Sequence, residues 1–160
     1  MSAPMATDYA AAFARLARPQ EPQWLQAIRE SAMERFLELG FPTLRQEEWK
    51  YTKVEFARKK TFEAASSSSN GLTADQLAQL TFGNLECARL VFVNGHYSRE
   101  LSSLRELSSR IRVQSLAEAL QENPERLKPH LARYAGYQDH AFVALNTAFL
   151  QDGAFVHVPE

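Results

Sequence analysis

Histidine, carboxylate, serine and cysteine side chains are the groups of this sequence that could perform chemistry, and few of them are spaced for it. No two of the four histidines have a metal-ligand spacing such as i and i+4. They are His96, His130, His140 and His157. The adjacent pair Glu47-Glu48 would point in different directions from a helix or a strand, so the two carboxylates would not converge on one substrate atom. We therefore expect structural or surface roles for these groups.

Serine and cysteine offer no clear nucleophile or cluster ligand set. The run Ser66 to Ser69 lacks a flanking base and is followed by Asn70-Gly71, which predicts a flexible linker. Cys87 is the single cysteine, so the chain can form no internal disulfide and cannot supply the several thiolates of an Fe–S cluster. We expect Cys87 to be a small packed side chain. The sequence thus predicts that the chain is not an enzyme and holds no cofactor or metal of its own.

The segment around Trp49, Lys50 and Tyr51 is the best candidate for binding, because basic and aromatic residues alternate there. Such a pattern can bind single-stranded nucleic acid. However, nearby glutamates dilute the basic charge and the chain has a formal net charge of -1. We expect instead that these aromatic residues pack on a neighbouring helix or contact a partner protein, and we expect no nucleic acid partner.

Neither targeting nor membrane insertion is predicted from the sequence. The first residues, Met1 to Met5, contain no basic region and no apolar core. No apolar stretch approaches the roughly 20 residues of a membrane helix. A hydrophobic content of 45% with 23% charged residues is typical of a folded domain in the cytosol, so we expect a cytoplasmic protein without a membrane partner.

Two helices are predicted at the start of the chain. The first covers residues 7–17, capped by Thr7 or Asp8, and the second covers 23–39. The apolar stripe of the second helix consists of Leu25, Ile28, Ala32, Phe36 and Leu39, and its charged residues, Arg29 among them, lie largely elsewhere. Gly40 and Pro42 end it. Residues 43–63 are predicted to be extended or to form short helical turns.

The middle of the chain changes its hydrophobic period from helix to strand. A capping box, Thr73 with Gln76, predicts a helix to Leu80. Residues 88–93 predict a strand, and Asn94-Gly95 predicts a tight turn that pairs Val93 with His96 and Phe92 with Tyr97. Another strand is predicted around Ile111 and Val113, followed by a helix from a second capping box, Ser115 with Glu118.

The last quarter predicts two helices and a strand. Asn123-Pro124 begins one helix, with Leu127, Leu131 and Tyr134 on its apolar face and Gly136 at its end. Asp139 is expected to cap the next helix, whose apolar stripe is Phe142, Leu145 and Phe149, while Ala144 and Ala148 permit close packing. Residues 154–158 then form a strand that we expect to find no partner among the preceding residues and to need a further domain.

These elements predict an α+β fold with N-terminal helices, a small β-hairpin region and a terminal strand. We divide the chain into a helical region at 1–63, a Ser-rich linker at 64–72, a helix, hairpin and helix region at 73–137, and a closing helix and strand at 138–160.

Three motifs resemble the SufB/SufD family of Fe–S cluster assembly scaffolds. They are Phe41-Pro42-Thr43 with Glu47-Glu48-Trp49-Lys50-Tyr51-Thr52, the hairpin Val91 to Ser98, and Phe142 to Phe149 followed by Asp152 to Pro159. Their order and separation are closer to SufD than to SufB, and the similarity covers the chain from about residue 24 onward.

The resemblance implies an N-terminal portion of a larger scaffold. Family members have an N-terminal helical region, a right-handed parallel β-helix and a C-terminal helical domain, and SufD-like proteins act with SufB-like and SufC-like partners in a SufBCD complex. This chain would include the first β-helix strand and would cap that β-helix. The Fe–S cluster would be handled by the full complex, and no functional residue of the family can be placed here.

Two other classes of function stay open. One is a helical protein-binding adaptor that uses the Trp49 to Tyr51 segment, and the other is a weak nucleic-acid-binding module. We also expect the chain to associate with itself through the terminal strand, more readily than a longer chain would.

Overall fold

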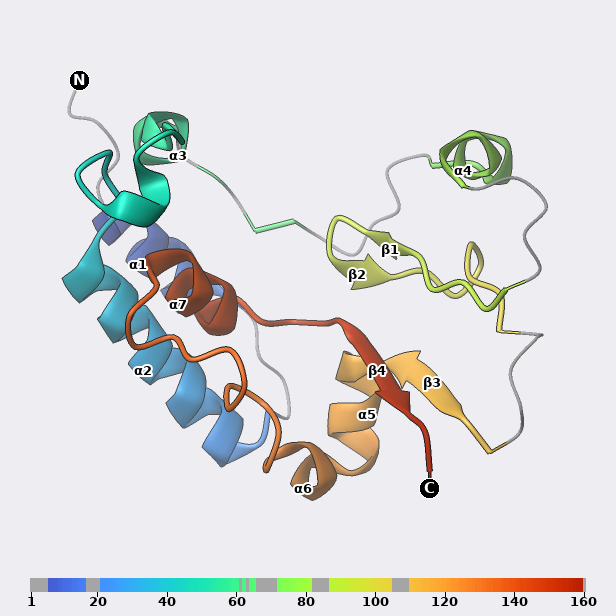
Figure 1. The fold of residues 1–160 in the computed structure, drawn as a ribbon. Coiled ribbons are helices and arrows are strands. Elements are labelled where there is room, and N and C mark those ends of the chain that lie inside the picture. The colour runs from blue at the N-terminus through green and yellow to red at the C-terminus, as the bar shows by residue number, and fades with distance from the viewer. Residues whose placement is uncertain are drawn as a thin grey trace. The chain divides into compact units, whose positions relative to one another are not determined.

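The structure is a computed structural model that describes residues 6–16, 21–60, 62, 64–65, 72–81, 87–104 and 110–159. The chain divides into two compact units (Figure 1). Unit 1 comprises residues 1–64 and 123–150, and unit 2 comprises residues 65–122 and 151–160. The chain therefore leaves unit 1 at Ala64, builds most of unit 2, returns to unit 1, and ends in unit 2. The boundary falls within the predicted linker, of which residues 66–71 lie outside the described part of the chain.

Unit 1 is helical. Its elements are α1 (Ala6–Arg15), α2 (Gln23–Leu39), the 3-10 helix η1 (Glu47–Trp49), α3 (Glu55–Lys59), α6 (Pro124–Leu127) and α7 (Ala141–Ala148). Both predicted N-terminal helices are present, and α2 has the predicted bounds. Gly40 ends α2 with a φ of 64°, a conformation that favours glycine, and its N–H donates to Phe36 O.

The core of unit 1 forms where α2 lies along α7 (Figure 1). Ala32 and Phe36 of α2, and Ala144 and Ala148 of α7, have no exposed surface. The small alanine side chains let the two helices approach closely, as predicted. In contrast, the larger predicted stripe of Phe142, Leu145 and Phe149 is only half-buried, because the alanines occupy the contact face.

Aromatic rings extend this core towards α1. Tyr9, Phe36 and Phe41 meet pairwise in edge-to-face geometry, with ring centroids 5.3 to 5.8 Å apart. The Tyr9 hydroxyl donates to Ala57 O at 2.9 Å, which ties α1 to α3. The segment for which the sequence allowed short helical turns contains η1 and α3, and the Tyr9 bond holds α3 against this ring cluster.

Arg29 departs from the predicted helical wheel. The sequence pattern placed it away from the apolar stripe, yet it is 4% exposed. Its guanidinium forms an ion pair with Glu21, and its Nε donates to Ala148 O at the end of α7. A buried charge needs such partners, and a wheel drawn for α2 alone contains neither of them.

Two predictions are wrong, one about the helix that begins at Pro124 and one about the cap of α7. The helix that begins at Pro124 ends at Leu127, so Tyr134 lies outside it and is 83% exposed. Ala132 adopts a φ of 56°, which a continuing α-helix excludes. Asp139 does not cap α7, because His140 occupies the N-cap position and makes no side-chain capping bond.

Unit 2 contains α4 (Ala74–Leu80), β1 (Phe92–Val93), β2 (His96–Tyr97), β3 (Arg112–Ser115), α5 (Leu116–Glu122) and β4 (Ala154–His157). The strands form two separate two-stranded antiparallel sheets, β1 with β2 and β3 with β4 (Figure 1). The described residues thus form an α+β arrangement with no closed sheet.

The predicted hairpin is confirmed with its register. Phe92 pairs with Tyr97 and Val93 with His96, and both turn residues, Asn94 and Gly95, have positive φ. The predicted strand from residue 88 is shorter than expected, because the Val91 N–H donates to the side chain of Ser102 instead of joining a ladder.

Two further expectations about unit 2 need correction. Cys87 is exposed rather than packed, since the strand it was expected to begin starts only at Phe92. The terminal strand β4 is not without a partner, because β3 pairs with it from Ser115↔Ala154 to Arg112↔His157. The sequence placed both strands correctly but did not reveal that they pair.

Capping follows the sequence closely at α4 and in part at α5. The Thr73 and Gln76 side chains each bind the other residue's backbone N–H, which completes the predicted box. At α5 only half of the predicted box forms: Ser115 Oγ accepts from Glu118 N, while the Glu118 carboxylate pairs with Arg99. Among the described residues, no helix combines the length and apolar composition that crossing a bilayer requires.

Candidate protein-contact sites

The Trp49 to Tyr51 segment is held in unit 1 by a short network of hydrogen bonds. Gln46 Oε1 accepts from Thr43 N at 2.7 Å, and Gln46 O accepts from Trp49 N at 2.9 Å. These bonds form the turn that leads into η1. The sequence predicted the position of the segment but not this turn, because the pattern of residues 43–63 has no single period.

The three predicted site residues face different surroundings. The Trp49 ring is half-buried, with its centroid 5.2 Å from that of Phe142. Tyr51 is 89% exposed, and Lys50 Nζ lies 5.5 Å from the centre of its ring and 3.8 Å from Glu47 Oε1. Trp49 therefore packs against α7, whereas Lys50 and Tyr51 together are open to a partner.

A cleft of about 330 Å³ lies beside this segment, within unit 1. Its lining residues are Phe41, Pro42, Thr43, Leu44, Thr52, Lys53, Val54, Glu55 and Arg58. The cleft combines apolar side chains from both flanks of η1 with two cations. The sequence shows the basic stretch but does not show that it lies next to Phe41 and Pro42, because this proximity arises only when the chain turns back through η1.

The charges around the cleft are unequally paired. Glu55 Oε2 lies 3.2 Å from Lys59 Nζ, and the hydrogen bond and charge of Lys59 lower the pKa of the Glu55 carboxyl, with smaller effects from Arg58 and Lys53. Among the ion pairs of the described residues, none includes Lys53 or Arg58. Among the described residues, therefore, no carboxylate neutralises Lys53 or Arg58 by direct contact.

A second hollow in unit 1 is almost entirely apolar. It has a volume of about 360 Å³ and is lined by Tyr9, Ala12, Phe62, Ala64, Phe142, Leu145, Asn146 and Phe149. This is where the half-buried stripe of α7 lies. It explains why the predicted stripe is not part of the closed core.

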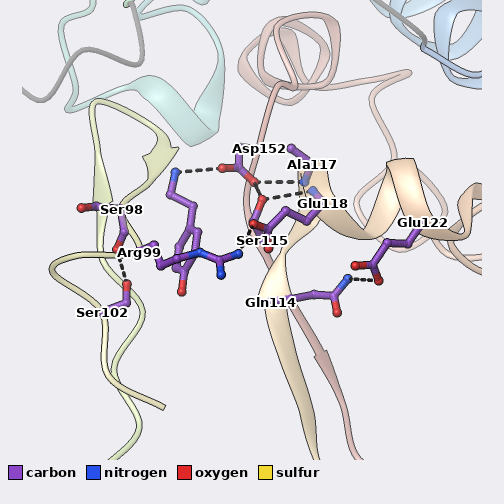
Figure 2. Close-up of polar contacts among 10 residues, drawn as sticks. Ser98, Arg99, Ser102, Gln114, Ser115, Ala117, Glu118, Glu122 and Asp152 are labelled. Atoms are coloured by element: carbon purple, nitrogen blue, oxygen red, sulfur yellow. Dashed lines mark hydrogen bonds and ion pairs between the residues drawn. The ribbon is translucent and has the colours of Figure 1, made fainter.

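Asp152 is the centre of a polar cluster in unit 2 that the sequence did not reveal (Figure 2). Its Oδ1 accepts from Ser115 Oγ at 2.7 Å, Ala117 N at 3.1 Å and Gly153 N at 2.8 Å, and its Oδ2 accepts from Tyr97 N at 2.8 Å. One carboxylate thus joins the β1–β2 hairpin, the start of α5 and the start of β4. The Asp-Gly pair before a strand was interpreted only as a turn.

The electrostatics of Asp152 follow from these bonds. Partial burial acts to raise the pKa of this carboxyl, but the hydrogen bonds from Ser115, Ala117, Tyr97 and Gly153 outweigh burial and lower it. Because its oxygens are already engaged by four donors, Asp152 is suited to holding structure together rather than to accepting a proton from a substrate.

The histidines are scattered in the described structure. His130 stacks on Tyr134, His140 lies 3.4 Å from Glu48, His96 lies 3.0 Å from Ala65 O, and His157 pairs across from Arg112 in the β3–β4 sheet. In the part of the chain that the structure describes, no three metal-ligating side chains gather in one place.

Comparison with known proteins identifies the family. The model of the SufBD protein N-terminal region matches residues 6–160. The iron-sulfur cluster assembly SufBD family protein slr0076 of Synechocystis sp. is 31% identical over 131 residues, covering 82% of this chain and 28% of that protein. The SufBD family protein ABCI9 of Arabidopsis thaliana is 25% identical over 158 residues, covering 88% of this chain and 34% of that protein. The chain thus spans about a third of the length of these relatives, and it belongs to the SufBD family through that family's N-terminal region.

Proposed function

We propose that the chain is the N-terminal part of a SufD-like scaffold for iron-sulfur cluster assembly, and that it acts through protein contacts rather than catalysis. Family membership supports the assembly role, since the names of both relatives include iron-sulfur cluster assembly. The hairpin and the entry into β4 carry the motifs that resemble SufD. In the full-length protein the partners would be SufB-like and SufC-like proteins in the cytoplasm, and the cluster would be the cargo of that complex.

The half-completed β3–β4 sheet is the observation that carries the scaffold proposal. Leu116 N donates to Gly153 O, which sets the hydrogen-bonding pattern of this antiparallel pair. Because the pattern alternates along a strand, the N–H and C=O groups of Phe155 and His157 face β3. The N–H and C=O groups of Ala154 and Val156 face away from β3. Within the described residues, nothing pairs with that outer edge.

Exposed apolar side chains accompany the open edge. Val156 is 56% exposed and Val158 is 66% exposed. An open edge beside exposed valines is a surface that proteins normally cover. We infer that the continuing chain of the longer family members pairs here, as the first rung of a right-handed parallel β-helix, and that unit 2 caps the end of that β-helix.

Amide hydrogen exchange tests the rung directly. We would compare the 160-residue chain with the full-length protein, following the amides of Ala154 and Val156. We expect much slower exchange in the full-length protein, because both amides would then donate to a neighbouring strand. Equal exchange rates in the two proteins would refute the rung.

Self-association of the 160-residue chain is a second readout of the same edge. Val156→Lys places a charge on the exposed face and should reduce association in light scattering. The matched control is Leu80→Lys, which changes a residue of α4 that is 75% exposed and lies in no sheet. Equal effects of the two variants would indicate non-specific hydrophobic association rather than pairing at the β4 edge.

The assembly role needs a test in the complex. Full-length protein should co-purify with SufB-like and SufC-like partners from its own cells, and its loss should lower the activity of Fe–S enzymes. Normal Fe–S enzyme activity in cells that lack the protein, together with no co-purifying partners, would refute the proposed function.

An adaptor that binds through Lys50 and Tyr51 is the second candidate, favoured by the exposure of Tyr51. Trp49→Ala alone would confuse binding with stability, because Trp49 packs on Phe142. Tyr51→Ala is the cleaner variant. Under the adaptor hypothesis it abolishes capture of a partner at unchanged melting temperature, and under the scaffold proposal it leaves SufB-like and SufC-like partners bound.

A further inference from the structure

We propose that the cleft between residues 41–44 and 52–58 binds an acidic peptide segment, with an apolar side chain of the peptide in the cleft and its carboxylates at Lys53 and Arg58. This inference stands on the cleft alone and does not depend on the Fe–S assembly role. It assigns a ligand class to a site for which neither the family nor the relatives specify one.

The floor of the cleft is apolar and fixed. Pro42 and Val54 are buried, Phe41 is half-buried in the aromatic cluster, and Leu44 at the rim is 47% exposed. A volume of about 330 Å³ is at the small end of ligand pockets, which suits one apolar side chain and the backbone beside it.

The rim supplies charge that is not used within the described structure. Of the five cations between residues 50 and 60, Lys50 faces Glu47 and Lys59 faces Glu55. Lys53 and Arg58 line the cleft and form no ion pair there. Glu55 also lines the cleft, and its carboxyl pKa is lowered chiefly by its bond to Lys59, with smaller effects from Arg58 and Lys53. A carboxylate placed between them would gain two favourable contacts.

A peptide fits this surface better than a nucleic acid does. A polyphosphate backbone needs a track of cations, whereas only two cations line the cleft. Glu47 and Glu48 are exposed nearby, so the cations do not continue as a track along this surface. The apolar floor of the cleft would not contact a phosphate backbone favourably, but it matches an aliphatic or aromatic side chain of a peptide.

The walls of the cleft are held before any ligand arrives. The Tyr9 hydroxyl fixes α3 through Ala57 O, and the Gln46 side chain fixes the opposite wall through Thr43 N. Residues already held in place lose little conformational entropy on binding, so even a small cleft can bind with measurable affinity.

The test uses the whole 160-residue chain, labelled with ¹⁵N, and a capped pentapeptide with one leucine flanked on each side by two glutamates. We expect chemical-shift changes at Thr43, Thr52 and Val54 that saturate with peptide. The counterpart with glutamines should bind at least about tenfold more weakly, because it loses the charge-assisted contacts to both Lys53 and Arg58. An oligothymidine of similar length is the nucleic acid probe.

Matched variants separate the cleft from the general basic stretch. Lys53→Ala with Arg58→Ala should weaken glutamate-peptide binding about tenfold or more. Lys60→Ala removes the same charge from a neighbouring residue that does not line the cleft, and it should change binding less than twofold. Arg58→Lys keeps the charge and should retain most of the affinity, which shows that any loss in the alanine variants is not due to unfolding.

Several outcomes would overturn the proposal. These are no saturable shift at the cleft residues, equal affinity for the glutamate and glutamine peptides, an equal loss in Lys60→Ala, and tighter binding of oligothymidine at the same residues. The last result would assign the cleft to nucleic acid instead. None of these outcomes bears on the β4 edge or on cluster assembly, so failure here leaves the proposed function to be judged by its own experiments.

Discussion

Unit 1 and unit 2 bury their apolar side chains to different extents. The large buried cluster of unit 1 joins α1, α2 and α7 around Phe36, which is fully buried. In unit 2 the buried apolar residues among those described are Leu77 of α4, Val91 just before β1, and Leu116 and Ala119 of α5. Unit 2 instead concentrates its long-range hydrogen bonds on Asp152. The comparison teaches that the two units of this family region are stabilised differently. Unit 1 depends on a packed apolar core, whereas unit 2 depends more on polar contacts and has an open sheet edge.

The largest effect should come from emptying the core of unit 1. Phe36→Ala removes a fully buried ring, and we expect the free energy of unfolding to fall by about 3–5 kcal/mol. Both tryptophans, Trp24 and Trp49, lie in unit 1, so tryptophan fluorescence during urea unfolding reports on this unit.

The control for Phe36→Ala is the neighbouring Leu37→Ala. Leu37 is 39% exposed and its truncation should cost much less. Amide exchange in β3 and β4 should respond less than exchange in α2. Equal destabilisation by the two variants would contradict the view that unit 1 stands on this packed core.

The next effect concerns the buried ion pair of Arg29 with Glu21, whose arginine also donates to Ala148 O at the end of α7. Arg29→Met leaves Glu21 buried without its partner, which should cost about 3 kcal/mol in the same urea titration. Replacing both residues by methionine should recover much of that loss, because no charge is then left unpaired. Lys59→Met breaks the exposed pair with Glu55 and should change the free energy of unfolding far less, because solvent screens that pair. A double variant as unstable as Arg29→Met would show that the bond to Ala148 O, not the ion pair, is what matters.

Arg29 also marks the limit of what the sequence predicted for unit 1. The period of 3.6 residues placed α1 and α2 and identified Ala32 and Phe36 as core, because burial of a helix face leaves a local pattern. One partner of Arg29, Glu21, precedes the helix and the other, Ala148 O, lies 119 residues further along the chain, so the helical pattern of α2 does not show that this arginine is buried. For the same reason the ring contact of Trp49 with Phe142 was beyond prediction.

In unit 2 the sequence predicted local geometry and missed the connections between elements. The turn at Asn94 and Gly95 and the box at Thr73 depend on residues a few positions apart, and both are confirmed. The pairing of β3 with β4 and the cluster at Asp152 join segments about 40 residues apart. The terminal strand was thus placed correctly while its partner was not found. The cleft at Lys53 and Arg58 was missed similarly, because it depends on how the chain folds back.

Asp152→Asn should destabilise unit 2 by about 2 kcal/mol. An amide cannot accept at both positions, so its NH₂ group would face one of the backbone donors, either Tyr97 N or Ala117 N. The measurement is amide exchange in β3, β4 and the hairpin, and tryptophan fluorescence should change little. The control is Asp139→Asn, an exposed aspartate of unit 1. Loss of protection confined to Gly153 would mean that Asp152 stabilises only its own turn.

The same carboxylate predicts a pH dependence. Its pKa in the folded chain lies below its ordinary value of 3.8, so the folded state favours the ionised form. Its contribution to stability is therefore fully present above about pH 4 and is lost as the pH falls through the lowered folded pKa. Unit 2 amides of the wild type should lose protection on acidification in that range. In Asp152→Asn this component should be absent, and an unchanged acid response in the variant would assign it to other carboxyls.

The smallest predicted effect tests how far unit 2 depends on local polar contacts. Helix α4 has seven residues and buries only Leu77, too little for a stable helix without its cap. Thr73→Ala removes the oxygen that accepts from Gln76 N and should cost about 1 kcal/mol, seen as faster exchange of the Gln76 and Leu77 amides. Thr73→Ser keeps the oxygen and should exchange nearly as the wild type does. If the alanine variant is equally protected, α4 is held by packing of Leu77, and the contrast between the two units is weaker than their buried residues indicate.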